Sequence, residues 1–262
     1  MRHYVFTALL IFAGCAAVRQ QLGSVLVPLQ TEVELGDKIA AQIEEQEKIH
    51  SDRRLQTYIR QLAAPLIRHS MEDRPEITYH ITVLDNPEQV NAFAVPGGHL
   101  YVYTGLLLVA ANEAEVAGIL AHEIGHVVGR HSANQLATQY GLGILASLAL
   151  GENPEEVGKM ASEWIGSGAL ARFSRDDERE ADKFGVKYTI AAGYDPRGLL
   201  TFFQKMKKME GRRRSELDNL LASHPATEER IRRIEKMIAA AGSPGGRTEA
   251  QRYLQKTAVL RR

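Results

Sequence analysis

Residues 112–131 read NEAEVAGILAHEIGHVVGRH, an apolar segment that carries an H-E-x-x-H motif at positions 122–126. Asn112 is a suitable N-cap, and the acidic residues just after it favour the positive end of a helix. The apolar spacing that follows predicts one continuous helix through position 131. His122 and His126 are four residues apart, so both imidazoles project from one face and can share a metal ion.

Glu123 follows the first histidine and lies about 100° round the helix from it. Its carboxylate can therefore reach a water molecule beside the metal rather than the metal itself. Two neutral imidazoles and a carboxylate base are what a zinc hydrolase needs, so we expect one Zn²⁺ per chain. The alternative is a pair of core histidines held by ordinary hydrogen bonds, but unpaired polar groups would be costly on so apolar a helix.

A third metal ligand is expected from the segment SRDDEREAD, residues 174–182. Glu178 and Asp182 are one helical turn apart, so one carboxylate can bind the metal while the other accepts a hydrogen bond from a ligand histidine. A solvated acidic helix face is the alternative interpretation of such a run. Glu180 lies about 200° round this helix from Glu178, and its replacement is expected to leave the metal in place.

His131 is a tempting further ligand that the helical geometry argues against. It follows His122 by nine residues, which is about 900° of rotation and hence the opposite face of a continuous helix. We therefore expect a packing or capping histidine at this position.

The other segments predict a mainly helical α+β domain with a small sheet of about three strands beside the H-E-x-x-H helix. Pro65 is expected to kink or end a helix early. The run at 140–150 is apolar but too short to cross a membrane. Expected helices cover residues 31–50, 52–69, 174–192, 196–211 and 227–240, and expected strands cover 77–84, 91–95 and 99–103 with a Pro-Gly-Gly turn at 96–98.

The N-terminus predicts export. Residues 1–14, MRHYVFTALLIFAG, combine a basic start with an apolar run that is too short for a membrane span and fits a signal peptide. The end of this run, from Phe12 to Cys15, resembles a bacterial lipobox, so we expect Cys15 to be lipidated once residues 1–14 are removed. An ordinary cleaved signal with an incidental cysteine is the alternative. Residues 15–30 would form a tether, 31–241 the catalytic domain and 242–262 a linker-like tail.

Charge and cysteine content narrow the classes of partner. Lys plus Arg and Asp plus Glu each number 32, and no extended basic stripe is present, so a nucleic-acid partner is not expected. The single cysteine excludes an intramolecular disulfide and a multi-cysteine metal site. Membrane contact is expected through the lipid anchor only, and no assembly partner can be named.

H-E-I-G-H followed by S-R-x-x-E-x-x-A-D resembles the HtpX/CAAX-prenyl-protease family of zinc metallopeptidases, and in particular its periplasmic BepA/LoiP-like branch. A C-terminal helical-repeat domain, which BepA-like proteins add, is not expected here. Residues 91–98 and the segment from Ser223 to Pro225, with Arg230 downstream, carry the same resemblance. It implies a zincin-like core of the gluzincin type, in which the zinc ligands are His122, His126 and Glu178, the base is Glu123 and the orienting carboxylate is Asp182.

The function that the resemblance implies is a zinc-dependent endopeptidase of the bacterial cell envelope that hydrolyses unfolded or misassembled polypeptides. Its expected location is the periplasm of a Gram-negative bacterium, anchored by lipid to the outer membrane. The alternative from another class is a zinc-containing lipoprotein chaperone or assembly factor with little proteolysis.

Two more segments are candidates for the active site. As an exposed edge strand, Asn91, Ala92, Phe93, Ala94 and Val95 could align an extended substrate through main-chain hydrogen bonds; as an inner strand they could not. Pro225 favours an extended backbone at His224, which is then free to point into a cleft. There His224 could stabilise an oxyanion or silence the enzyme as a zinc ligand. A surface histidine that caps the next helix is the plainer alternative.

Overall fold

The computed structural model describes residues 27–166, 173–209, 220, 223–225 and 227–261, so the expected signal peptide and Cys15 lie outside the described residues. The strands are β1 (His80–Leu84), β2 (Ala92–Val95) and β3 (His99–Tyr103). The helices before the metal motif are α2 (Leu29–Gln46), α3 (Arg53–Ser70) and α4 (Thr104–Val109), and the helix that carries it is α5 (Glu113–Val128). After it come α6 (His131–Tyr140), α7 (Leu142–Ala149), α8 (Pro154–Gly166), α9 (Arg175–Ala191), α10 (Arg197–Met209), α12 (Glu228–Ala240) and α13 (Ala250–Lys256).

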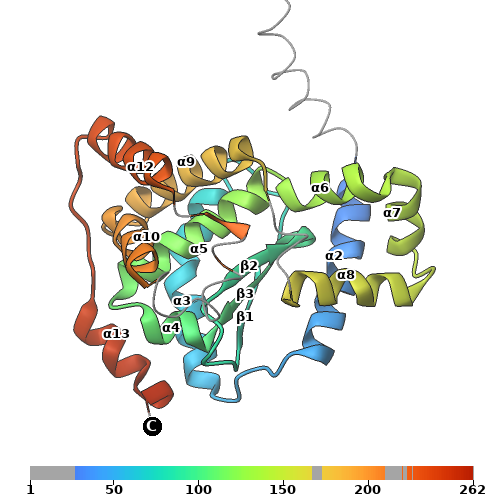
Figure 1. The fold of residues 1–262 in the computed structure, drawn as a ribbon, viewed down its shortest axis with the longest axis horizontal. Helices are drawn as coiled ribbons and strands as arrows, with labels where there is room; N and C mark the ends of the chain where they lie inside the picture. The colour runs from blue at the N-terminus through green and yellow to red at the C-terminus, as the bar shows by residue number, and fades with distance from the viewer. Residues whose placement is uncertain (1–26, 167–172, 210–219, 221–222, 226, 262) are drawn as a thin grey trace, which may run out of the picture.

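The three strands form one mixed sheet in the order β1-β3-β2 (Figure 1). β1 runs parallel to β3, with His80 opposite His99, and β2 runs antiparallel to β3, with Ala94 opposite Leu100. The turn between β2 and β3 needs glycine, because Gly97 has a φ of 78°. The expected fold class, mainly helical α+β with a small three-stranded sheet, is confirmed.

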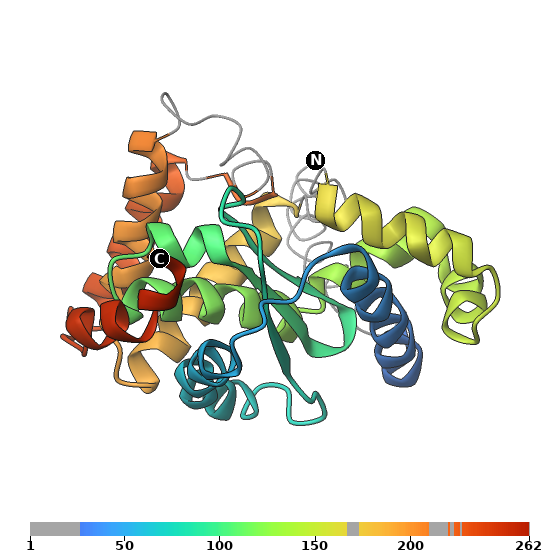
Figure 2. The same ribbon diagram turned by 90° about the horizontal axis from the view of Figure 1, so that it is seen from below.

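Each face of the sheet covers a separate hydrophobic core. Alternate residues of a strand point to opposite faces, and Leu100 of β3 accordingly joins the core formed with α3, α5 and α10. The next residue, Tyr101, joins the core on the other face, with α2, α7 and Trp164 of α8. Figure 2 shows the same division, with α7 and α8 on one side of the sheet and α13 on the other.

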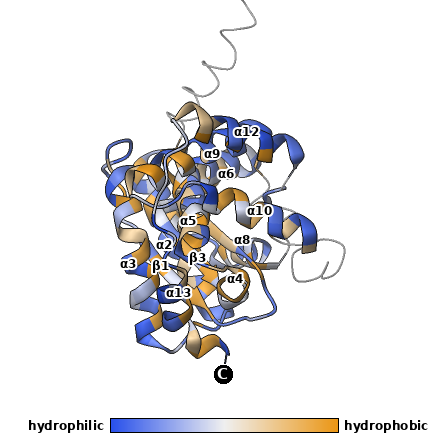
Figure 3. Ribbon diagram, turned by 90° about the vertical axis from the view of Figure 1, so that its left-hand side faces the viewer, coloured by the Kyte–Doolittle hydropathy of each residue, from blue (hydrophilic) through white to orange (hydrophobic). Residues whose placement is uncertain are grey.

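Helix α5 lies in the middle of the larger core, with every residue from Glu113 to Val127 buried. Hydrophobic residues colour much of the ribbon around it in Figure 3, whereas much of α12 is hydrophilic. The expected N-cap is present, since the Asn112 side chain accepts a hydrogen bond from the Glu115 amide at 3.0 Å. The metal motif is therefore carried on a helix that is enclosed along almost its whole length.

Helix α5 ends before position 131, unlike the continuous helix that the sequence predicts. Gly129 is its C-cap, Arg130 adopts a left-handed conformation with φ 57°, and His131 begins α6. Tertiary contacts hold this break. Arg130 Nε donates to the buried Glu32 carboxylate of α2 at 2.9 Å, and Arg130 Nη2 also donates to the Val27 carbonyl. The break turns the chain back towards the metal motif.

Two other segments differ from expectation. Helix α3 continues through Pro65 to Ser70, because the burial of Leu62 and Leu66 on the same face outweighs the hydrogen bond that proline cannot make. Residues 247–261, part of the tail expected to be linker-like, instead pack on the domain. Tyr253 is fully buried and its hydroxyl donates to the Leu107 carbonyl at 2.5 Å.

Among the described residues, no helix combines the length and apolar character that a membrane crossing requires. The apolar run at 140–150 contains the last residue of α6 and all of α7. Its residues are divided between core and surface, since Leu145 and Leu148 are buried in the core while Ile144 and Leu150 are exposed.

Candidate metal centre

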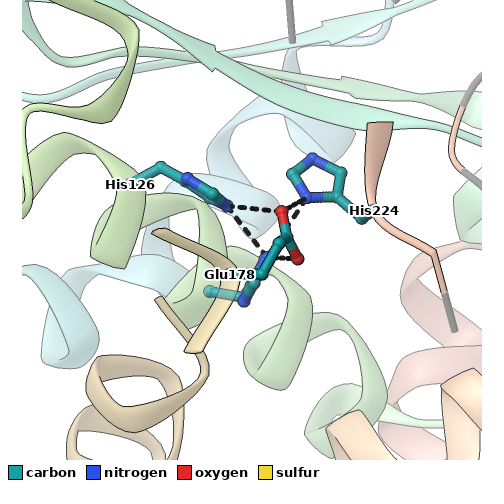
Figure 4. A group of neighbouring side chains, drawn as sticks. His126, Glu178 and His224 are labelled. Carbon is teal, nitrogen blue, oxygen red and sulfur yellow. Dashed lines mark hydrogen bonds and ion pairs between the residues drawn. The ribbon is translucent and has the colours of Figure 1, made fainter. Parts of the chain in front are cut away.

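Four buried side chains from three parts of the chain converge on one point. His122 and His126 come from α5, Glu178 from α9 and His224 from the segment before α12, and one donor atom from each lies within 4.8 Å of all the others. The Nε2 atoms of His122 and His126 are 3.0 Å apart. Glu178 Oε1 is 2.7 Å from His224 Nδ1 and 3.4 Å from His126 Nε2. Figure 4 shows His126, Glu178 and His224 pointing towards one another.

Small residues let α5 and α9 approach closely enough for this convergence. A Cβ atom added to Gly125 would lie 2.9 Å from the Ala181 carbonyl oxygen, and one added to Gly185 would lie 3.4 Å from His122 Cα. The start of α9 is fixed by a capping box in which the side chain of Ser174 accepts from the amide of Asp177. Glu178 therefore enters the site from the first turn of a well-anchored helix.

The donor set fits a divalent cation. Burial lowers the pKa of His122 to about 4, with Arg230 acting in the same direction, and burial also holds the pKa of His126 well below its usual value. Both rings are therefore neutral, the form in which imidazole binds metals. Burial opposes the charge on Glu178, but His224 and Arg230 outweigh it and keep the pKa of this carboxyl low. Three ring nitrogens and one carboxylate are ligand types typical of zinc.

Asp182, which the resemblance implied as the orienting carboxylate, lies behind His122. Its Oδ1 is 3.2 Å from His122 Nδ1, so it can accept the proton of the ring nitrogen that faces away from the ligand group. Asp182 is fully buried, and it is balanced by Arg230, whose Nη2 is 2.7 Å from Oδ1. Arg230 Nη1 also forms an ion pair with Glu178 Oε2 at 2.6 Å.

The sequence marks Arg230 only through the family resemblance and gives it no role. An arginine on an amphipathic helix is ordinarily solvated, and nothing in its immediate neighbours distinguishes it from Arg232 or Arg233. Only the docking of α12 on α9 reveals that Arg230 is 3% exposed while Arg232 faces solvent. Its guanidinium also lies 4.3 Å from the centre of the Phe203 ring.

Glu123 lies beside the ligand group rather than in it. Its carboxylate is buried, with Oε1 3.6 Å from His224 Nε2, and it accepts a hydrogen bond from the Ala94 amide of β2. Burial raises the pKa of Glu123 to about 7. His224 Nε2 is itself buried and has no hydrogen-bond partner among the described residues. A carboxylate with a pKa near neutrality is suited to take up and release a proton.

Strand β2 is at the edge of the sheet, but Asn91 and residues 92–95 are all buried. Asn91 accepts from the Tyr103 amide of β3, so by alternation the backbone groups of Ala92 and Ala94 face the free edge. At that edge the Ala94 carbonyl accepts a hydrogen bond from Ser132 Oγ at 3.1 Å. Substrate alignment along β2 stays a prediction, and in this conformation part of the edge is already bonded.

His131 and Glu180 lie closer to the ligand group than the sequence predicted. Because α5 ends at Val128, His131 is not on the opposite face of a continuous helix, and its Nδ1 is 2.9 Å from His126 Nδ1. Glu180 points away from Glu178 but contacts His131, with Oε2 3.3 Å from Nε2.

Comparison with known proteins gives one family match. The model of peptidase family M48 matches residues 50–238. The beta-barrel assembly-enhancing protease of Escherichia coli is 29% identical over 76% of this chain and 42% of its own length. The mitochondrial metalloendopeptidase OMA1 of Schizosaccharomyces pombe is 32% identical over 63% of this chain and 48% of its own. The metalloprotease YcaL of Escherichia coli is 32% identical over 58% of this chain and 59% of its own.

The chain spans less than half the length of the beta-barrel assembly-enhancing proteases that it matches. The matched region nevertheless contains the converging ligand residues, from His122 of α5 to His224 before α12.

Proposed function

We propose, because the chain belongs to peptidase family M48, that it is a zinc-dependent metalloendopeptidase. This membership confirms the family and the class of enzyme that the two motifs predicted. The observation that carries the proposal is the buried group of three histidines and one glutamate with Glu123 at its side. The relatives above are named as a protease, a metalloendopeptidase and a metalloprotease.

His122, His126 and Glu178 would hold the zinc ion, which when bound supplies a Lewis acid that polarises the scissile carbonyl. Glu123 takes the proton of the attacking water and passes it to the leaving amine, a task for which its raised pKa is suited. Asp182 keeps the proton of His122 on Nδ1, so that Nε2 stays available as a ligand. Arg230 balances the two carboxylates.

His224 would close the site in the conformation described here. Catalytic zinc sites have three protein ligands and an open position, whereas four protein ligands close the coordination sphere. The proximity of His224 Nδ1 to Glu178 supports its role as a fourth, silencing ligand over that of an oxyanion donor. His224→Ala should then raise peptidase activity and keep the metal. A fall in turnover of about 10²–10³-fold with metal retained would instead support the oxyanion role.

The substrates would be unfolded or misassembled polypeptides of the bacterial envelope. Main-chain pairing along β2 depends little on substrate sequence, which suits such substrates. The edge groups of Ala94, now bonded to Ser132 and Glu123, are those that an extended peptide would use. The E. coli relative is named a beta-barrel assembly-enhancing protease, which supports an envelope role. The lipobox-like sequence before Cys15 supports attachment by lipid, from the periplasm, to the outer membrane.

A chaperone or assembly factor that keeps the zinc site but rarely cleaves is the second candidate, and Glu123→Gln separates the two. The variant and the wild type would be compared for zinc content and for cleavage of casein. A peptidase predicts that Glu123→Gln retains zinc and loses cleavage. Glu235→Gln, an exposed substitution of the same kind on α12, is the matched control and should cleave as the wild type does. Equal cleavage by all three proteins would overturn the assignment of Glu123.

A further inference from the structure

The second ligand histidine has a buried partner that none of the catalytic roles above uses. His126 turns its Nε2 towards the ligand group, 3.0 Å from His122 Nε2. Its other ring nitrogen, Nδ1, lies 2.9 Å from Nδ1 of His131, a side chain that is only 4% exposed. The opposite nitrogen of His131, Nε2, lies 3.3 Å from Glu180 Oε2 and 3.7 Å from Asp177 Oδ1 on α9.

These contacts allow one consistent assignment of protons. An imidazole that binds metal through Nε2 carries its proton on Nδ1, so His126 must donate from Nδ1. The acceptor is His131 Nδ1, which then has no proton of its own. A neutral His131 therefore carries its proton on Nε2, where the carboxylate of Glu180 accepts it. Each ring nitrogen of His126 and His131 then binds metal, donates one hydrogen bond or accepts one, and the negative charge lies on Glu180.

The backbone is shaped to place the His131 ring at this spot. A Cβ atom added to Gly129 would lie 2.3 Å from His131 Nε2, so the ring occupies space that only glycine leaves free. The left-handed turn at Arg130 then brings the ring back beside α5. One face of the His126 ring is covered by Phe173, whose ring stacks on it at 4.0 Å between ring centres. The break after α5 thus places the His131 ring beside His126 of the same helix.

We propose that His131 and Glu180 are positioning residues that fix the tautomer and orientation of the metal ligand His126. This proposal rests on the proposed metal function of the site and deepens it. Both motif histidines would then be backed by a carboxylate, His122 directly by Asp182 and His126 by Glu180 through His131. A histidine that only fills space at position 131 would be replaceable by another ring of similar size.

The test is metal affinity, measured by zinc competition with a chromophoric chelator on the full chain. His131→Phe keeps a ring but removes the acceptor for His126, and it should weaken zinc binding by about 10–100-fold. His131→Asn keeps an acceptor near the position of Nδ1 and should recover part of this loss. Glu180→Gln removes the charge at the outer end and should weaken binding less than His131→Phe. The control is Asp176→Asn on the same turn of α9, where the side chain is 79% exposed and pairs with Arg179.

A second readout separates positioning from a general loss of structure. The visible absorption of the Co²⁺-substituted protein reports coordination geometry, and it should change in His131→Phe while far-UV circular dichroism and the Asp176→Asn spectrum stay as in the wild type. Wild-type zinc affinity and cobalt spectrum in His131→Phe would overturn the proposal, as would an equal loss of affinity in His131→Phe and His131→Asn. A wild-type protein that binds no zinc at all would instead refute the metal function itself, which distinguishes the two failures.

Discussion

Replacing Arg230 should destabilise the fold more than replacing any other arginine of α12. Its side chain is 3% exposed, and it faces the fully buried Asp182 and the buried Glu178 at 2.7 and 2.6 Å. Burial alone would raise the pKa of Asp182, but Arg230, with His122, outweighs it and holds that pKa at about 2. Arg230→Met keeps most of the volume and removes the charge, so it leaves a buried carboxylate without its main counter-ion.

Removing one partner of a buried ion pair costs about 3–5 kcal/mol. Part of the charge on Asp182 stays compensated, because Arg233 Nη2 remains 3.3 Å from Oδ2. We therefore expect a loss near the lower end, about 3 kcal/mol. In a domain of this size that loss corresponds to a fall in Tm of about 6–12 °C.

The assay is urea unfolding of chelator-treated protein at pH 7, followed by far-UV circular dichroism, so that bound metal makes no contribution. Arg232→Met is the matched control, since its side chain is 65% exposed and pairs only weakly with Glu228 at 3.7 Å. It should change the free energy of unfolding by less than about 0.5 kcal/mol. Adding Asp182→Leu to Arg230→Met should restore part of the loss, because one of the two buried carboxylates that face Arg230 is then removed, while Glu178 keeps its contact with His224 Nδ1 at 2.7 Å. Equal losses in Arg230→Met and Arg232→Met would refute the reasoning.

Three further predictions concern separate parts of the chain. Glu178→Ala should abolish stoichiometric zinc binding while Asp176→Ala keeps it, and equal metal content in the two purified variants would remove Glu178 from the ligand set. Burial opposes the charge on Asp73, but hydrogen bonds from Lys187 and Tyr188 outweigh it and lower the pKa of this carboxyl. The contribution of Asp73 to the free energy of unfolding is therefore present above its unfolded-state pKa and lost as the pH falls through its folded-state pKa. Asp73→Asn should thus reduce the free energy of unfolding by about 1 kcal/mol at pH 7, with a difference that shrinks below about pH 4, as urea titrations across this range would show. Cys15→Ser should block lipoprotein processing and leave the signal attached, whereas the same mature N-terminus in both forms by mass spectrometry would indicate ordinary cleavage.

The parts of the site that lie within one helix could be predicted from the sequence. His122, Glu123 and His126 follow from helical geometry alone, and the one-turn spacing of Glu178 and Asp182 places their carboxylates on one face of α9. The same local rule failed at His131. The left-handed conformation of Arg130 that ends α5 depends on a bond to Glu32, which is 98 residues earlier in the chain. No local pattern carries that information.

The contacts that the C-terminal third of the chain makes with the site and the domain could not be predicted from local sequence patterns either. Arg230 has its role only because α12 docks against α9, 48 residues away from Asp182 in sequence. The segment 247–261 follows a glycine-rich stretch at 242–246 that is typical of a linker. Two hydrogen bonds hold it on the domain. The Tyr253 hydroxyl donates to the Leu107 carbonyl of α4, and the Glu113 amide donates to the Thr248 carbonyl at 2.9 Å. Such contacts follow from tertiary packing, which composition does not encode.

A peptidase that attacks unfolded chains would endanger its own newly made copies, and the assembly of this site from distant segments offers a safeguard. His122 and Arg230 are 108 residues apart, and Glu178 lies between them on a third helix. An emerging chain that has formed α5 alone has two ligands, too few to retain a zinc ion. Hydrolytic competence therefore arrives only when α9 and α12 have docked. By then the molecule is itself folded and, under the proposed function, would no longer be a substrate for its neighbours.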